Sequence, residues 1–137
     1  MIVPGLVRPP FNSSKNYSFR ITHLSQVDGV IRKIGSLFKK HGINVARAEH
    51  NRALGNARRH GKLPILVNQS FSNGRAFLTV KDNGKGFNVK NTLHKFRTGQ
   101  HYWHNHGGGM KTFNKNRNVK VNWSDNGKKI SLLYQNK

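Results

Sequence analysis

The chain has 137 residues, and its 25 lysines and arginines outnumber its 4 aspartates and glutamates to give a formal net charge of +21. This length has room for one domain with one core. Hydrophobic residues make up 34% of the chain, enough to fold rather than to stay disordered. The absence of cysteine excludes disulfides, cysteine-ligated zinc and a thiol nucleophile. Four carboxylates also argue against a two-carboxylate hydrolase or an acidic calcium site.

The sequence also limits where the protein is expected to act and what it is expected to bind. No apolar run is long enough to cross a bilayer, so we expect no membrane partner. Residues 1–10 lack a basic start, a sustained apolar stretch and a small-residue cleavage pattern, so we expect no secretory signal. The sequence therefore predicts a cytoplasmic domain with anionic partners.

The first elements follow from prolines and from helical periodicity. Residues 1–15 contain three prolines and predict an extended arm ahead of a single domain over 16–137. A short strand is predicted at Tyr17–Thr22. Ser25 is the expected N-cap of a helix that ends at His41-Gly42. The apolar residues of this helix recur at i, i+3, i+4 and i+7, namely Val27, Val30, Ile31, Ile34, Leu37 and Phe38.

The middle of the chain predicts a second helix and two strands. The helix runs over about Val45–His60 and ends at Gly61, with a thin apolar stripe. Strands are predicted at Pro64–Val67 and Ala76–Lys81. A turn at Ser72-Asn73-Gly74 joins them.

The last third predicts a loop and a hairpin. Residues 83–109 are polar, with few apolar side chains, and predict a long loop. A short helix is expected to begin near Lys111. Strands at Asn118–Trp123 and Lys129–Tyr134 are joined by Ser124-Asp125-Asn126-Gly127, a hairpin turn.

The tetrapeptide Asp-Asn-Gly-Lys occurs twice, in different surroundings. The copy at 125–128 lies between two strands, and a turn explains it. The copy at 82–85 also follows a strand, but it continues through Gly86-Phe87 into polar sequence with no returning strand. Closely spaced glycines let a backbone approach a ligand, and an ionised Asp82 suits an amino group such as that of adenine. The alternative for this copy is an ordinary turn.

Two more clusters carry possible chemistry. His106-Gly107-Gly108-Gly109-Met110 precedes the expected short helix, where backbone N–H groups favour a phosphate; the alternative is a flexible linker. Asn56 and His60 lie near the end of the second helix. An Asn oxygen can coordinate phosphate-bound Mg²⁺. The alternatives are a solvated Asn56 and a His60 that interacts with the helix dipole.

Taken in chain order, the three clusters resemble the motifs of the histidine-kinase-like ATPase superfamily, the GHKL or Bergerat ATPases. GNARRHG is similar to its N-box, VKDNGKGF to its first glycine box and HGGGMKTF to its second. The resemblance is strongest to the small anti-sigma-factor serine/threonine kinases and covers about residues 16–135. It implies an α/β (α+β) two-layer sandwich, with a mixed, mostly antiparallel sheet that carries helices on one face.

The resemblance also implies cofactors, site residues and partners. ATP and Mg²⁺ would be the cofactors, and a sigma factor or an anti-anti-sigma factor the kind of regulatory partner. Asn56 would hold Mg²⁺, and Asp82 would accept from the adenine amino group. The other expected nucleotide-binding residues are His60, Gly84 and Gly86, together with Gly107 and Gly109 in a lid over the phosphates.

One departure from the family concerns catalysis. The N-box of the family has a Glu four residues before its Asn, as a general base or water-positioning group. Arg52 occupies that position here and cannot accept a proton. Glu49 lies seven residues before Asn56, a full turn too far to reach the same water. The sequence therefore favours nucleotide binding over serine/threonine kinase activity.

Two other functional interpretations remain open. The first is a basic nucleic-acid-binding protein, ribosomal-type or phage-encoded, which the charge, Arg58-Arg59, Lys39-Lys40 and the aromatic Tyr102-Trp103 favour. Non-specific binding of other polyanions would follow from the same charge. The second is an ordinary domain whose surface has been rewritten or supercharged and which retains no activity.

Overall fold

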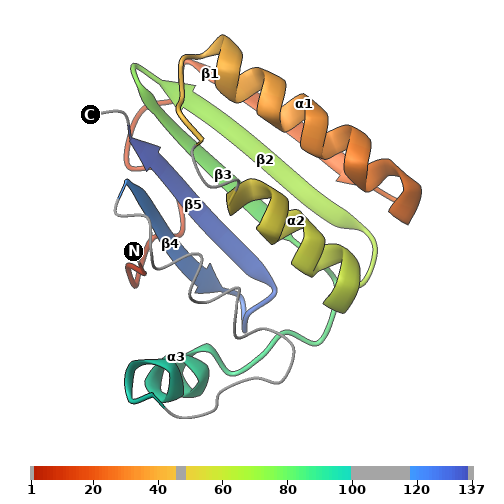
Figure 1. Cartoon of the computed structure of the whole chain (residues 1–137), viewed down its shortest axis with the longest axis vertical. Coiled ribbons are helices and arrows are strands. Elements are labelled where there is room, and N and C mark those ends of the chain that lie inside the picture. Colours follow the sequence, from red (N-terminus) through yellow and green to blue (C-terminus); the bar gives the residue numbers. More distant parts are fainter. Residues whose placement is uncertain (1, 46–48, 100–117, 136–137) are drawn as a thin grey trace.

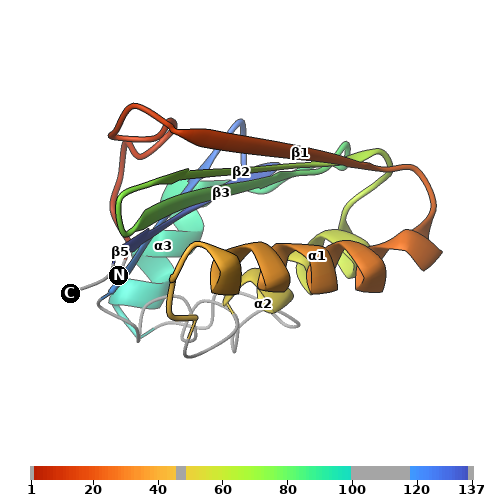
Figure 2. The ribbon, with the colours of Figure 1, turned by 90° about the horizontal axis from the view of Figure 1, so that it is seen from above.

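The computed structural model of the chain describes residues 2–45, 49–99 and 118–135. Five strands of this part form one sheet, and two helices, α1 and α2, lie together on one of its faces (Figures 1 and 2). The elements are β1 (Lys15–Ile21), the 3-10 turn η1 (Leu24–Gln26), α1 (Val27–Lys40), α2 (Glu49–His60), β2 (Ile65–Ser72), β3 (Arg75–Lys81), α3 (Val89–Arg97), β4 (Val119–Ser124) and β5 (Lys129–Gln135). None of these helices has the length and apolarity that crossing a membrane requires.

The sheet has the strand order β1-β2-β3-β5-β4, and each neighbouring pair is antiparallel. A parallel contact occurs at an isolated bridge between Ile2 and Val121, at the edge formed by β4. The prediction of a two-layer α+β sandwich is confirmed at this level, but the five named strands form an antiparallel sheet rather than the mixed one that was expected.

The core lies between the sheet and the two helices. Alternate residues of each strand face the helices, because successive side chains of a strand point to opposite faces. Phe38 of α1 packs on Tyr134 of β5, with ring centroids 4.7 Å apart. Leu54 of α2 and Leu78 of β3 are fully buried in the same layer. The predicted apolar stripe of the first helix is therefore the stripe that faces the sheet.

The N-terminal arm contacts the sheet at β4 and β5, on the face that α1 and α2 leave open. The carbonyl oxygen of Leu6 accepts a hydrogen bond from the side-chain amide of Asn122 at 3.1 Å. By strand register, Phe77 and Leu133 point to this face, and each is only 2% exposed. These two side chains therefore lie in a second buried apolar layer, outside the helix-facing core.

One prediction was wrong: the segment after the first Asp-Asn-Gly-Lys copy is not loop throughout. It contains α3, whose N-cap Asn88 accepts a hydrogen bond from the Asn91 N–H at 3.0 Å. Val89, Leu93 and Phe96 have the i, i+4, i+7 spacing of a short amphipathic helix, and Leu93 is buried. The numerous polar residues concealed this signal. The rest of the expected loop, from 100 on, and the expected short helix near Lys111 lie outside the described residues.

The turns were predicted well and some element starts were not. Gly42, with φ +70°, follows the end of α1, and Asn73 and Gly74 turn the β2–β3 hairpin with φ of +29° and +77°. Ser25 is not the N-cap of α1: it lies within η1, and Gln26 is the cap residue. Strand β2 extends five residues beyond the predicted Val67, because β1 pairs with it as far as Phe71 and β3 as far as Ser72.

Candidate functional site

The polar face of α2 presents Asn56 and His60, which the N-box resemblance implies, together with Arg52, which departs from it. Arg52, Asn56 and His60 are spaced four apart, which places them on one side of the helix. Asn56 is half-buried, and the other two are exposed. The buried side of the helix consists of Ala53, Leu54 and Ala57, with Glu49 and His50 in its first turn.

The end of α2 touches the start of the first Asp-Asn-Gly-Lys copy. The helix closes with a hydrogen bond of 2.9 Å from the Gly61 N–H to the Ala57 carbonyl. A Cβ atom on Gly61 would lie 2.5 Å from Cγ of Asp82, so a side chain here would displace the carboxylate. Gly61 therefore does more than end the helix. Because it has no side chain, the end of α2 can contact the loop that begins at Asp82.

Backbone hydrogen bonds hold the loop after β3 in place on two sides. The Asp82 N–H donates to the Lys128 carbonyl at 3.0 Å, and the Asn83 N–H donates to the Lys62 carbonyl at 2.8 Å. Within the loop, Oδ1 of Asp82 accepts from the Gly84 N–H at 2.7 Å. The carboxylate is thus oriented before any ligand arrives, with one oxygen used in the loop.

Gly86 joins this loop to the second copy of the tetrapeptide. Its φ is +72°, and a Cβ atom on it would collide with the carbonyl oxygen of Asn126. That oxygen accepts a hydrogen bond from the Phe87 N–H at 2.7 Å. The two copies of Asp-Asn-Gly-Lys therefore pack against each other at the same end of the sheet.

The Asp82 carboxylate lies in basic surroundings without an ion pair. In the described parts of the chain, no lysine or arginine nitrogen comes within 4.0 Å of it. Its neighbour Lys81 instead places Nζ 2.9 Å from the carboxylate of Asp125. The backbone carbonyls of Lys62 and Lys128 accept the hydrogen bonds given above, so both lysines are close to the loop. The half-buried carboxylate of Asp82 is consequently available to a hydrogen-bond donor of a ligand.

His60 contributes an uncharged side chain at neutral pH. Partial burial and the neighbouring charge of Arg59 lower the pKa of His60 from its ordinary value of 6.5. A neutral imidazole can both donate and accept hydrogen bonds. Among the described residues, no three His, Asp or Glu side chains gather as ligands of a metal ion would.

Glu49 lies at the other end of α2 and is part of the core. It is completely buried, and burial of Tyr134 and then the charge of Glu49 raise the pKa of Tyr134. Beside it, burial lowers the pKa of His50 to about 4. Asn56 lies seven positions after Glu49, about 10 Å further along the helix axis. Glu49 therefore does not supply the carboxylate that is missing at position 52.

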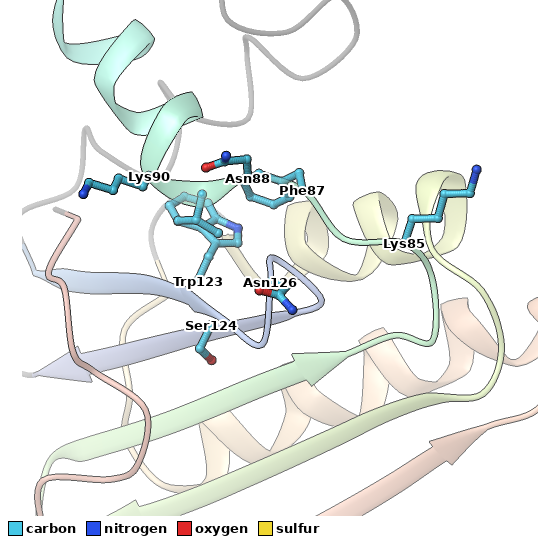
Figure 3. Close-up of a pocket in the computed structure, with 8 residues that line it drawn as sticks. Lys85, Phe87, Asn88, Lys90, Trp123, Ser124 and Asn126 are labelled. Carbon is cyan, nitrogen blue, oxygen red and sulfur yellow. The ribbon is translucent and has the colours of Figure 1, made fainter.

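A pocket of about 590 Å³ adjoins the loop, and sequence reasoning missed it. It lies between the start of α3 and the β4–β5 hairpin (Figure 3). Its lining residues are Lys85, Phe87, Asn88, Val89, Lys90, Trp123, Ser124 and Asn126. The sequence did offer a signal, because an aromatic residue lies close to each tetrapeptide. Phe87 follows the first copy after one residue, and Trp123 precedes the second copy by one residue.

The structure thus brings together part of the predicted site. Asp82, Gly84 and Gly86 form one loop, and Asn56 and His60 lie on the last two turns of the helix that ends against it. Gly107 and Gly109 lie outside the described residues.

Comparison of the sequence with protein-family models and with curated proteins gives no match. The geometry of these residues therefore carries the functional argument.

Proposed function

We propose that this protein is an ATP- and Mg²⁺-binding regulatory domain with a Bergerat-type nucleotide site. The site would lie where the end of α2 meets the loop of residues 82–86. The observation that carries the proposal is the oriented Asp82 carboxylate, which touches Gly61 and has no described lysine or arginine within 4.0 Å.

The residues present fit an adenine base. One oxygen of Asp82 is held by the Gly84 N–H, and the other can accept from an exocyclic amino group. Neither Gly61 nor Gly84 has room for a Cβ, which would lie 2.5 Å from Cγ and 2.8 Å from Oδ1 of Asp82, respectively. The two glycines thus leave backbone rather than side chains around the carboxylate, as close approach of a flat base requires.

The same surface suits the charge of a triphosphate. Lys62 and Lys128 both belong to segments whose carbonyls accept backbone hydrogen bonds from the loop. When bound, Mg²⁺ would neutralise phosphate charge. Asn56 would supply one amide oxygen to it, because Mg²⁺ prefers oxygen ligands and keeps most of its shell as water and phosphate. His60, uncharged at neutral pH, would donate to a phosphate oxygen.

The positions of the carboxylates favour binding without efficient phosphoryl transfer. All four acids of the chain are described, and each is accounted for. Asp28 pairs with Arg58 at 3.1 Å, Asp125 pairs with Lys81, and Glu49 is buried. Asp82 serves the base. None of them replaces a general base beside Asn56, so a regulatory role in the cytoplasm, with a protein partner of the sigma or anti-anti-sigma kind, fits better than kinase turnover.

Isothermal titration calorimetry with Mg·ATP at moderate salt tests the proposal. We expect saturable binding that Asp82→Asn weakens about 5- to 100-fold, because a buried amino group then meets a donor instead of an acceptor. The substituted side chain keeps an oxygen for the Gly84 N–H, so the loop is preserved.

Asp125→Asn is the matched control, since it makes the same substitution in the same tetrapeptide. It should weaken Mg·ATP binding far less than Asp82→Asn does, because Asp125 pairs with Lys81 and does not face the proposed base. Equal affinities for ATP, GTP and inorganic tripolyphosphate, insensitive to Asp82→Asn and falling steeply with salt, would show attraction by charge alone and would overturn the proposal.

A further inference from the structure

The pocket beside the loop has a fixed aromatic wall. Phe87 and Trp123 meet edge to face, with ring centroids 6.4 Å apart and planes at 71°. The Phe87 N–H is bonded to the Asn126 carbonyl, and the Phe87 ring packs on Gly127, where a Cβ would collide with it. Trp123 is carried by β4 and packs partly against the core. Both rings are therefore in place before a ligand binds.

The polar lining of the pocket is basic or neutral. Lys85 and Lys90 lie on opposite sides of the aromatic pair (Figure 3). Asn88 and Asn126 add amides, and none of the described lining residues is acidic. A ligand that matches this lining has a flat ring, hydrogen-bonding edges and negative charge on both sides of the ring.

The pocket is a surface groove that a chain can cross. Lys85, Asn88, Lys90 and Asn126 are all exposed, whereas the two rings are half-buried. In single-stranded nucleic acid each internal base is flanked by a phosphate on either side. Sequence-independent binding of such strands combines aromatic stacking with cations along the backbone. A free mononucleotide carries its phosphate on one side only and leaves one lysine without a partner.

We propose that this groove binds single-stranded nucleic acid, with one base stacked on Trp123 and the flanking phosphates at Lys85 and Lys90. The site does not depend on ATP binding at Asp82, which is not among its lining residues.

Tryptophan fluorescence tests the proposal directly. The chain has two tryptophans, so Trp103→Phe leaves Trp123 as the reporter. We expect a short oligothymidylate to quench this signal saturably. Heparin, a polyanion without bases, should bind without comparable quenching, and AMP should bind far more weakly than the oligonucleotide.

Substitutions separate stacking from charge. Trp123→Leu should weaken oligothymidylate binding about 5- to 100-fold, the effect of losing one base–aromatic stack. Lys85→Ala with Lys90→Ala should reduce the slope of log affinity against log salt by about 1.4, the contribution of two single-strand phosphates. This pair is exposed, so it tests the site even if Trp123→Leu disturbs packing.

The matched control removes two exposed lysines from α1, Lys33→Ala with Lys39→Ala, and should change affinity less than the groove pair does. Asp82→Asn should leave oligothymidylate binding intact, which separates this site from the ATP site. Four results would overturn the proposal: no quenching by the oligonucleotide, equal quenching by heparin, AMP binding as tight as the oligonucleotide, or equal losses from the α1 pair and the groove pair.

Discussion

The two Asp-Asn-Gly-Lys copies share a sequence and differ in almost everything else. In the second copy Asp125 has φ +55°, is exposed and pairs with Lys81, as a hairpin-turn residue can. In the first copy Asp82 is half-buried against Gly61 and accepts the Gly84 N–H. The second copy returns the chain to a strand, whereas the first leads on to α3.

The difference shows that neighbours, not the tetrapeptide, determine the role of each carboxylate. Lys81 lies next to Asp82 in sequence but on the opposite side of the strand end, where it meets Asp125. Because Lys81 pairs with Asp125 of the second copy, it does not compete with a ligand for Asp82 of the first copy. The contact between the copies, through the Asn126 carbonyl, makes the turn part of the scaffold of the candidate site.

The largest effect is expected from Gly86→Ala, which breaks the contact between the copies. The added methyl group collides with the Asn126 carbonyl, and the alanine must also adopt the φ of +72° that Gly86 has. We expect a loss of about 3 kcal/mol or more in the free energy of unfolding, measured by urea denaturation.

Gly99→Ala isolates the backbone part of that effect. Gly99 has nearly the same φ, +73°, but nothing lies within 4 Å of its added Cβ. It should cost only about 1 kcal/mol, the strain of a left-handed alanine. Equal losses of unfolding free energy in the two variants would mean that the contact between the copies does not stabilise the fold.

A smaller effect, on binding, is expected from one glycine of each copy. The added Cβ of Gly84→Ala lies 2.8 Å from Oδ1 of Asp82 and displaces the carboxylate, so Mg·ATP affinity should fall about tenfold, or about 1.4 kcal/mol. Gly127→Ala should instead displace the Phe87 ring and weaken oligothymidylate binding. Calorimetry and Trp123 fluorescence measure the two affinities on the same pair of proteins.

The two glycine variants thus serve as controls for each other. Each should spare the ligand that the other loses, after correction for the folded fraction. If both variants lose both ligands in parallel, the two candidate sites are one site, and the division between the copies is wrong.

The sequence predicted what periodicity and turn chemistry control. The apolar stripe of α1, the Asn73-Gly74 turn and the β4–β5 hairpin each depend on residues close together in sequence, and each was confirmed. The helix α3 was missed because its apolar positions are only three among lysines and asparagines. Its N-cap, Asn88, and the i, i+4, i+7 spacing were the signals to weigh.

The candidate site was predicted as a set of motifs, but its contacts were not predictable. Nothing local to Gly61 indicates that Asp82 will lie on it, and nothing local to Lys81 indicates that it will pair with Asp125. Both contacts arise when α2 and the hairpin meet the end of β3. Tertiary contacts of this kind also explain the pocket, whose two rings are 36 residues apart in the chain.

The smallest effect is expected from Lys81→Met, which tests how the copies divide the available cation. The hydrogen bond from Lys81, and then its charge, lower the pKa of Asp125 from its ordinary value of 3.8. A lowered carboxyl pKa stabilises the fold above the unfolded-state value, and this contribution is lost as pH falls through the folded-state value. In Lys81→Met the pKa of Asp125 should rise towards 3.8, with Lys128 and Lys129 holding it slightly below. Carboxyl ¹³C NMR titration measures the change. An unaltered Asp125 would mean that Lys81 is not committed to the second copy and remains a possible partner for Asp82.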